Sequence, residues 1–531
     1  MRAHVRILVS LLVAGTLALG VALPATQGAT DRNTLVIAQN TGDLITMDPA
    51  VVYEVIGAVI VDQLYDNLVE LVMERGTMAV KPELAEKFTR SEDGKTWTFT
   101  LRPRLQFPSG RPINAEAVVY SLRRAVRMNK TPAWVITQLG FTAQNADQTI
   151  RALDEHNVQL TLSHAFAPNL VLSVLAFPVA AVVDPSVVEQ HLRDGEWATN
   201  WMKDHSAGSG PYRLIRWERN EIVDLIVNER YWKGVPPVKR IIIRDVPEPT
   251  TQRLLLERGD VDVAWNLRPE MVDEMRKDRR PGVGIFMTPA HGYSYVGMNV
   301  KFKPFSDERV RQAVRLSIDY DGIINNIYRG LGIKLHTIIP RGYLGYNPAL
   351  IKPDLGRARK LLAEAGYPNG FDAELILTPV APNPDVGVKL QSDLARVGIR
   401  VKVSQLPGAQ LFPKYRAQGH EMVFAGWGVD YPDPDALAKP FADYKTRQIA
   451  FRNAWSDDAA SDLANKAVLE PDPRKRAQMY KQLTDHVLNK GPYAIIVQRL
   501  EYWAYRGSVK GWEDAAALGT MDFDYTRVRK D

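Results

Sequence analysis

Strand-like and helix-like patterns alternate along most of this 531-residue chain. Residues 34–38 and 492–497 are short apolar runs typical of buried strands, whereas apolar residues recur at helical spacing over 306–318 and 473–488. This alternation predicts mixed α/β layers and argues against a helical bundle or a β-sandwich. The chain is long enough for two or three domains with substantial cores.

The N-terminal residues have the pattern of a secretory signal peptide. Arg2 and Arg6 precede an uncharged, mostly apolar run over residues 7–23. We expect a cleaved signal peptide over residues 1–29, with the cleavage point open and an uncleaved membrane anchor as the alternative. The chain contains no cysteine, so we expect neither disulfides nor a lipid-modified cysteine after the signal. The mature protein is therefore expected to be free in the periplasm.

The net charge is modest for the length of the chain. The formal charge of +6 falls to +4 when Arg2 and Arg6 leave with residues 1–29, a segment that contains no acidic residue. Clusters of basic residues are short, as at 276–280 and 474–476, and such clusters are typical of solvated helix ends. We therefore expect no nucleic-acid partner.

Motifs that would indicate an enzyme or a metal site are incomplete. Residues 94–96 (GKT) resemble the end of a phosphate-binding loop, but Thr89 stands where that loop needs glycine. The nine histidines show no paired metal-ligand spacing. Asp260 and Asp262 alternate along a predicted strand, where they form either an acid–base pair or a solvated strand start. The sequence thus predicts no catalytic residues, no metal ligands and no cofactor.

An aromatic residue and three acids follow a predicted strand within residues 421–435. The apolar start of this segment predicts the strand, which Gly426 and Gly428 are expected to end. Ligands of open α/β sheets bind at strand ends. Trp427 beside Asp430 suits a ligand with an apolar body and a cationic group. The alternative is an ordinary acidic surface turn.

Distinctive segments follow one another in order over nearly the whole chain. The most specific are 93–102 (DGKTWTFTLR), whose Asp-Gly turn predicts a β-hairpin, and 107–118 (FPSGRPINAEAV), in which Asn114 is placed to cap a helix. The others are 208–212, 228–232, 259–262, 309–314, 361–367, 426–427 and 430–434. In this order the segments resemble the family five extracellular solute-binding proteins, which serve dipeptide, oligopeptide and nickel ABC importers.

The resemblance implies an α/β fold with two lobes, that of the large peptide-binding type of class II periplasmic binding proteins. It implies an extra subdomain inserted in lobe I and a ligand enclosed by hinge closure between the lobes. The expected division gives lobe I residues 30–287, with the insertion at about 75–205, and gives lobe II residues 288–497. Residues 498–531 are expected to return to lobe I.

The resemblance also implies a set of ligand-binding residues. In peptide-binding members, the Asp two residues before the Pro-Asp-Pro segment pairs with the ligand's α-amino group, and the preceding Gly-Trp strand offers backbone hydrogen bonds. By position these are Asp430, Gly426 and Trp427, with Gly428 beside them. Similar dipeptide binders place a carboxylate-pairing Arg near 374–380, where this chain has none.

We therefore expect the periplasmic substrate-binding component of an ABC importer. It would capture a short peptide or a similar amine-bearing solute and deliver it, as a monomer, to a permease and ATPase complex at the inner membrane. An opine, an oligosaccharide or a metal chelate is the alternative ligand within this class. A secreted hydrolase and a peptide-binding chaperone or assembly scaffold are the alternatives from other classes.

Overall fold

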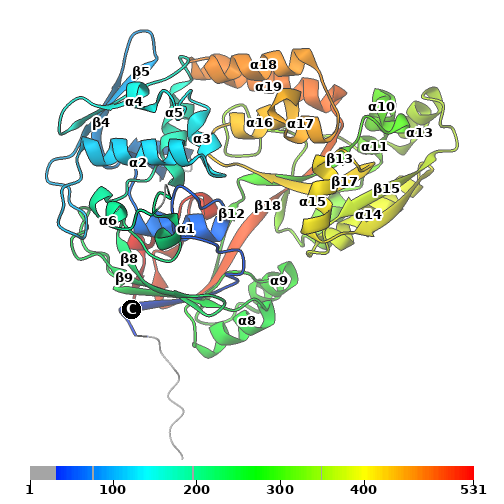
Figure 1. Ribbon diagram of the computed structural model, residues 1–531. Helices are drawn as coiled ribbons and strands as arrows, with labels where there is room; N and C mark the ends of the chain where they lie inside the picture. The colour runs from blue at the N-terminus through cyan, green and yellow to red at the C-terminus, as the bar shows by residue number, and fades with distance from the viewer. Residues whose placement is uncertain (1–30, 75–76, 194–195, 349) are drawn as a thin grey trace, which may run out of the picture.

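Two lobes lie side by side and share one 12-stranded mixed sheet (Figure 1). The computed structural model describes residues 31–74, 77–193, 196–348 and 350–531, so the predicted signal peptide lies outside the described residues. Across the sheet the strands are β16 (Ile399–Gln405), β15 (Phe371–Leu377), β17 (Met422–Gly428), β13 (Gly292–Met298), β18 (Tyr493–Arg506), β11 (Val263–Ala264), β1 (Thr34–Gln39), β10 (Arg240–Asp245), β9 (Ile222–Val227) and β8 (Tyr212–Glu218), while β12 (Val283–Pro289) and β14 (Gly332–Lys334) also pair with β18.

Lobe I is built around β1, which pairs in parallel with β10 and β11. Its core contains Ile37, Leu225, Ile243 and Trp503, all at most 1% exposed. Helices α1 (Val55–Leu64), α7 (Thr199–Met202), α8 (Pro249–Arg258), α9 (Pro269–Asp278) and α20 (Trp512–Ala515) belong to this lobe, as do the short strands β19 (Val509–Lys510) and β20 (Arg529–Lys530).

The subdomain of lobe I has its own four-stranded sheet, in the order β4 (Ala85–Arg90), β5 (Thr96–Leu101), β7 (Asn157–Thr161) and β6 (Ile150–Ala152). The predicted hairpin is confirmed by the pairing of β4 with β5, and Gly94 takes the positive φ of +71° that its turn needs. Asn114 caps α2 (Ala115–Met128) as predicted, because its side chain accepts a hydrogen bond from the Ala117 amide at 3.0 Å. The remaining helices are α3 (Ala133–Thr137), α4 (Ala146–Thr149), α5 (Pro168–Leu175) and α6 (Pro185–Gln190).

Apolar residues recur at helical spacing over residues 52–71 and predict one helix there, but only the first part of this stretch is helical. Helix α1 ends at Leu64, and the chain continues as β2 (Val69–Glu74), which pairs with β3 (Thr77–Pro82). Leu68 and Leu71 fit a helical period, but Val69 and Leu71 fit an alternating strand as well. Pairing with β3 decides between the two patterns.

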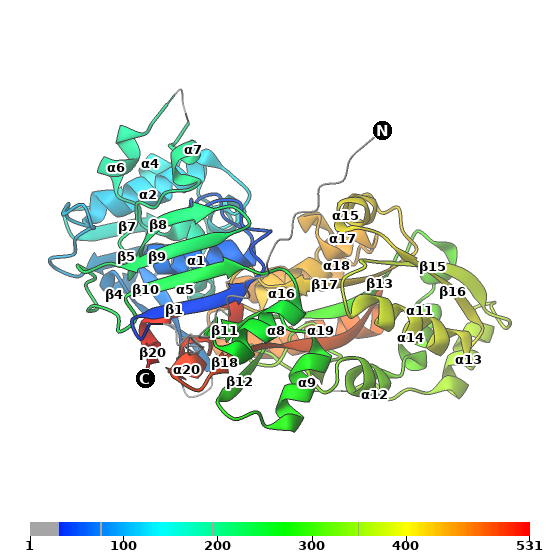
Figure 2. The ribbon, with the colours of Figure 1, turned by 90° about the horizontal axis from the view of Figure 1, so that it is seen from below.

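Lobe II packs its helices on β13, β15, β16 and β17 (Figure 2). Its core contains Val296, Leu375, Met422 and Ala494, all fully buried. The helices are α10 (Lys303–Ser306), α11 (Glu308–Ser317), α12 (Tyr320–Gly322), α13 (Leu355–Glu364), α14 (Asn383–Ala395), α15 (Gly408–Arg416), α16 (Asp435–Ala442), α17 (Ile449–Arg452), α18 (Asp458–Leu469) and α19 (Pro473–Lys490).

Two segments connect the lobes. The chain passes from β12 in lobe I to β13 in lobe II, and the long strand β18 returns, pairing with β13 through its first half and with β12 through its second. Figure 1 shows β18 running from one lobe into the other. The proposed domain limits at 287 and 497 fall inside β12 and β18, where a hinge would lie.

The lobes also touch away from these crossings. Val468 of α18 accepts a hydrogen bond from the Ala167 amide of the subdomain at 3.0 Å, and the Tyr431 hydroxyl donates to Gln138 at 3.1 Å. Among the described residues, none of the helices combines the length and apolar character that a bilayer crossing requires.

Candidate functional site

A large cavity lies between the two lobes, where the chain crosses. Its volume is about 1180 Å³, compared with roughly 300–1,000 Å³ for typical ligand pockets. Lobe I contributes Asn40, Asp43, Tyr53, Glu54, Trp265, Asn266 and Arg268 to its wall, lobe II contributes Tyr328, Val380, Pro382 and Phe412, and the crossings contribute Ala290, Arg499, Glu501 and Tyr502. The cavity therefore has room for a ligand of several residues.

Strand β18 forms part of the cavity wall in its middle section. Its residues are buried from Tyr493 to Gln498 and again at Trp503 and Ala504, but Arg499 is exposed between them. Glu501 follows two residues later, and both of its carboxylate oxygens accept hydrogen bonds from Thr520, each at 2.8 Å. Burial raises the pKa of the Glu501 carboxyl above its usual range, and the Thr520 hydrogen bonds and the Arg499 charge oppose this shift.

Asp430 lies at the edge of the cavity and bonds across the lobes. The Tyr53 hydroxyl of lobe I donates to the Asp430 carboxylate of lobe II at 2.6 Å, and the Trp134 indole donates to the same hydroxyl at 3.3 Å. Burial raises the pKa of Asp430 to about 6, with the Tyr53 hydrogen bond acting in the opposite direction. Tyr53 lines the cavity, so Asp430 is one hydrogen bond away from its wall.

The strand that precedes Asp430 is longer than predicted. It continues through both glycines to Gly428, because Gly426 and Gly428 pair with Ser294 and Gly292 of β13. On its other side β17 pairs with β15 only at Met422 and Val423, so among the described residues β13 is its single strand partner from position 424 onward. Both glycines are exposed, and a Cβ added at Gly428 would meet no atom within 4 Å. This edge of β17 is therefore open.

Trp427 is half-buried, and its ring is fixed by two contacts within lobe II. Its indole donates to the Ala436 carbonyl at 2.9 Å, and the Arg452 guanidinium lies over its ring, 5.6 Å from the centroid. The four predicted ligand-binding residues lie together at the end of β17 and just after it, and in the described part of the chain none of them forms the cavity wall. Asp430 is linked to that wall through Tyr53.

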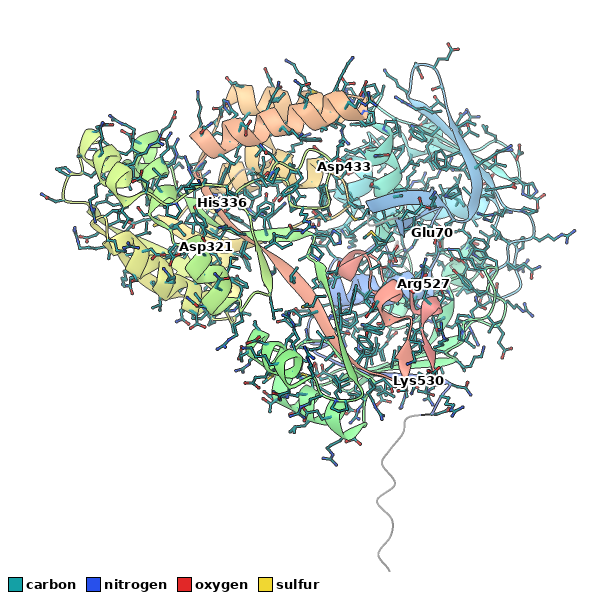
Figure 3. All side chains as sticks on the ribbon, turned by 180° about the vertical axis from the view of Figure 1, so that it is seen from behind. Glu70, Asp321, His336, Asp433, Arg527 and Lys530 are labelled. Atoms are coloured by element: carbon teal, nitrogen blue, oxygen red, sulfur yellow. The ribbon has the colours of Figure 1, made fainter. Side chains whose placement is uncertain are left out.

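The other two acids of this segment serve the fold. Asp433 is 1% exposed and forms a two-pronged ion pair with Arg476 of α19, with both distances at 2.6 Å. Asp435 starts α16 and accepts a hydrogen bond from the Tyr431 hydroxyl at 2.9 Å. Figure 3 shows Asp433 beneath α18 and α19.

The sequence patterns missed several residues of the cavity. Tyr53 and Arg499 lie far from residues 421–435 in the chain, and neither belongs to a recognisable motif. The available signal was one charged residue, Arg499, directly after a long apolar run that predicts a strand. Within the segment 374–380, Val380 lines the cavity. Glu374 does not line it, and its carboxylate accepts hydrogen bonds from Ser404 at 2.8 Å and from Lys414 at 2.9 Å.

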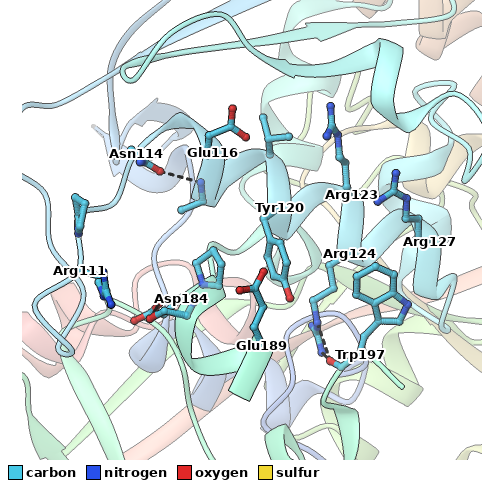
Figure 4. Close-up of a pocket in the computed structure, with 15 residues that line it drawn as sticks. Arg111, Asn114, Glu116, Tyr120, Arg123, Arg124, Arg127, Asp184, Glu189 and Trp197 are labelled. Atoms are coloured by element: carbon cyan, nitrogen blue, oxygen red, sulfur yellow. Dashed lines mark hydrogen bonds between the residues drawn. The ribbon is translucent and has the colours of Figure 1, made fainter. Parts of the chain in front are cut away.

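A second cavity of about 500 Å³ lies on the outer face of lobe I, between α2 and α6 (Figure 4). Three of the four arginines that line it, Arg123, Arg124 and Arg127, are already bonded within the fold, while Arg111 is exposed. Arg124 pairs with Asp48 at 2.8 and 2.6 Å and donates to the Trp197 carbonyl, while Arg123 and Arg127 both pair with Asp147. In the ranges that the structure describes, no group of three or more His, Cys, Asp or Glu side chains could hold a metal ion.

Comparison with known proteins identifies the kind of protein that carries this cavity. The family model of bacterial extracellular solute-binding proteins, family 5 Middle, matches residues 79–448. The chain belongs to this family. The predicted family and the two-lobed α/β fold are thus confirmed, and so is the broad function of a solute-binding protein.

Individual relatives of this solute-binding protein differ in what they are named for. It is 27% identical over 504 residues to the probable D,D-dipeptide-binding periplasmic protein DdpA of Escherichia coli, covering 93% of this chain and 94% of the relative. It is also 27% identical over 472 residues to heme-binding protein A of Haemophilus influenzae, covering 85% and 84%. The structure of the Helicobacter pylori periplasmic binding protein DppA in complex with the peptide STSA matches with a TM-score of 0.77 at 25% identity, covering 94% of this chain and 98% of that one.

Proposed function

We propose that this solute-binding protein captures a short peptide with a free amino group between its two lobes. The observation that carries the proposal is Asp430, a carboxylate at the end of the open β17 edge that already bonds Tyr53 of the opposite lobe at 2.6 Å. A carboxylate in this position offers a charge-assisted hydrogen bond to an ammonium group that reaches it from the cavity.

The open edge of β17 supports a peptide ligand in particular. An extended peptide can add to an exposed strand edge, where main-chain hydrogen bonds supply affinity with little dependence on side chains. Gly426 and Gly428 suit this mode, because both are exposed and neither projects a side chain toward the approaching backbone. The volume of about 1180 Å³ leaves room for side chains of several kinds.

The Tyr53–Asp430 hydrogen bond couples ligand binding to lobe closure. A ligand that contacts both residues stabilises the arrangement in which the lobes meet, and so shifts the population toward the closed form. In this role the protein acts in the periplasm as a monomer without a cofactor and delivers its ligand to the permease of an ABC importer.

The experiment is a thermal-shift measurement with alanine peptides of two to five residues. A peptide present at about one hundred times its Kd stabilises the folded protein by about 2.7 kcal/mol, which raises the thermal midpoint. We expect Asp430→Asn to lose this rise, while Asp372→Asn, which removes an exposed carboxylate of β15, keeps it. A wild-type midpoint that no peptide raises would contradict the proposed function.

A further inference from the structure

The middle of β18 carries the guanidinium group of Arg499, which faces the cavity between the lobes. Arg499 lines the cavity and is exposed, and among the described residues its side chain makes no hydrogen bond or ion pair. The nearest carboxylate on the strand is Glu501, whose oxygens are both bonded to Thr520. Arg499 affects Glu501 only through its charge, which opposes the effect of burial on the carboxyl.

The backbone that carries Arg499 is held on two sides. Arg499 pairs with Gly332 of β14, the Arg499 carbonyl accepts a hydrogen bond from the Ala290 amide at 2.9 Å, and Leu500 pairs with Pro289 of β12. The backbone at Arg499 is therefore already ordered, so little additional backbone entropy is lost when the side chain binds an anion. Its planar donors match the two oxygens of a carboxylate.

The described lobe II residues that line the cavity include no second cationic group that could bind a ligand's carboxylate in place of Arg499. Val380, Pro382 and Phe412 present apolar groups there, and the segment 374–380 contains no Arg. The other guanidinium of the wall belongs to Arg268, at the start of α9 in lobe I, where it is also exposed and without an ion pair among the described residues.

We infer that Arg499 binds the terminal carboxylate of the ligand, so that the protein selects zwitterionic peptides over peptides with a blocked C-terminus. This inference rests on the proposed function and assigns the second charged end of the ligand. Asp430 and Arg499 then hold opposite ends, one at the β17 edge and one on the crossing strand. Arg499 is preferred to Arg268 because β18 carries it into the region between the lobes, where a closed ligand lies.

The test is calorimetric titration with the alanine peptide that raises the thermal midpoint most, used with a free carboxylate and with a C-terminal amide. We expect the wild type to bind the free acid at least about tenfold more tightly than the amide, which is the scale of one charge-assisted contact. Arg499→Gln should lose this preference while binding the amide as the wild type does. Arg499→Lys should keep part of it, because the charge remains and the planar fork is lost.

Two further variants separate the possible outcomes. Arg357→Gln removes an exposed arginine of α13 outside the cavity and should leave both affinities unchanged. Arg268→Gln should keep the preference for the free acid. If Arg268→Gln loses this preference and Arg499→Gln keeps it, the assignment of Arg499 is wrong. If the wild type binds acid and amide equally, the peptide function stands and the role of Arg499 fails. If it binds neither form of any alanine peptide, the proposed function fails and this inference with it.

Discussion

The two cavities of this protein differ in how many of their arginines are already bonded. On the outer face of lobe I, Arg124 is 1% exposed and makes a two-pronged ion pair with Asp48. Between the lobes, Arg499 is exposed and has no hydrogen bond or ion pair among the described residues. In the outer cavity, Arg124 links the subdomain to Asp48, and Arg123 and Arg127 pair with Asp147 within the subdomain. In the cavity between the lobes, neither Arg268 nor Arg499 has a side-chain hydrogen bond or ion pair among the described residues.

This difference teaches that the presence of arginines in a cavity is a poor guide to ligand binding. A guanidinium whose donors are used inside the fold has little left for a ligand, and breaking its bonds leaves a buried charge. The unused donors and acceptors of the cavity between the lobes, together with the open edge of β17, distinguish this cavity from the outer one. Asp430 and Asp433 differ as well, because Asp430 accepts a hydrogen bond from the neutral Tyr53 hydroxyl, whereas Asp433 is ion-paired with Arg476.

The largest expected effect is on stability, and it distinguishes the two arginines. Arg124→Gln leaves Asp48 buried without its counter-charge and should lower the free energy of unfolding by about 3–5 kcal/mol. Arg499→Gln should change it by about 0.5 kcal/mol or less, because no bond within the described structure is lost. Urea denaturation of the two variants and the wild type measures the difference. Equal destabilisation by both variants would show that the two arginines contribute equally to the stability of the fold.

A smaller effect is expected from the facing glycines of β13 and β17. A Cβ at Gly292 would overlap the Trp427 carbonyl oxygen, so Gly292→Ala should cost about 1–3 kcal/mol of stability. A Cβ at Gly428 would meet open space, so Gly428→Ala should leave the fold unchanged. The added methyl group should weaken peptide binding, because it lies at the strand edge where the peptide is proposed to bind. Denaturation and calorimetry on the two variants check this. A Gly428→Ala protein that binds peptides as the wild type does would show that no ligand approaches that edge.

The smallest effect is a pH dependence of affinity. Burial raises the pKa of Asp430 to about 6 from its ordinary value of 3.8. The stability contributed by protonation of the Asp430 carboxyl is therefore fully present below pH 3.8 and is lost as the pH rises through 6.

The ligand's ammonium needs the ionised carboxylate, so peptide affinity should increase as pH rises through this pKa and be about tenfold weaker near pH 5 than near pH 7. Calorimetry at the two pH values should find the same change in Asp372→Asn, which keeps the Asp430 carboxylate. A wild-type affinity that is independent of pH over this range would remove Asp430 from the amine contact.

Local signals in the sequence predicted much of the fold, and long-range contacts account for the rest. The Asp-Gly turn at Gly94 and the cap at Asn114 depend on a few neighbouring residues, so both were predictable. The β2–β3 hairpin was missed because its apolar residues fit either period. Tyr53 was missed for another reason, since its contact with Asp430 joins residues 377 positions apart, and no pattern near either residue encodes that pairing.

Amide hydrogen exchange shows whether a peptide lies between the lobes along the open edge of β17. Exchange would be measured with and without a saturating alanine peptide in β17 and, for comparison, in α2 beside the outer cavity. We predict that amides within residues 424–428 exchange at least about tenfold more slowly with peptide, while those of α2 are unchanged. Unchanged exchange rates in β17, or slowing confined to α2, would mean that no peptide binds along this edge.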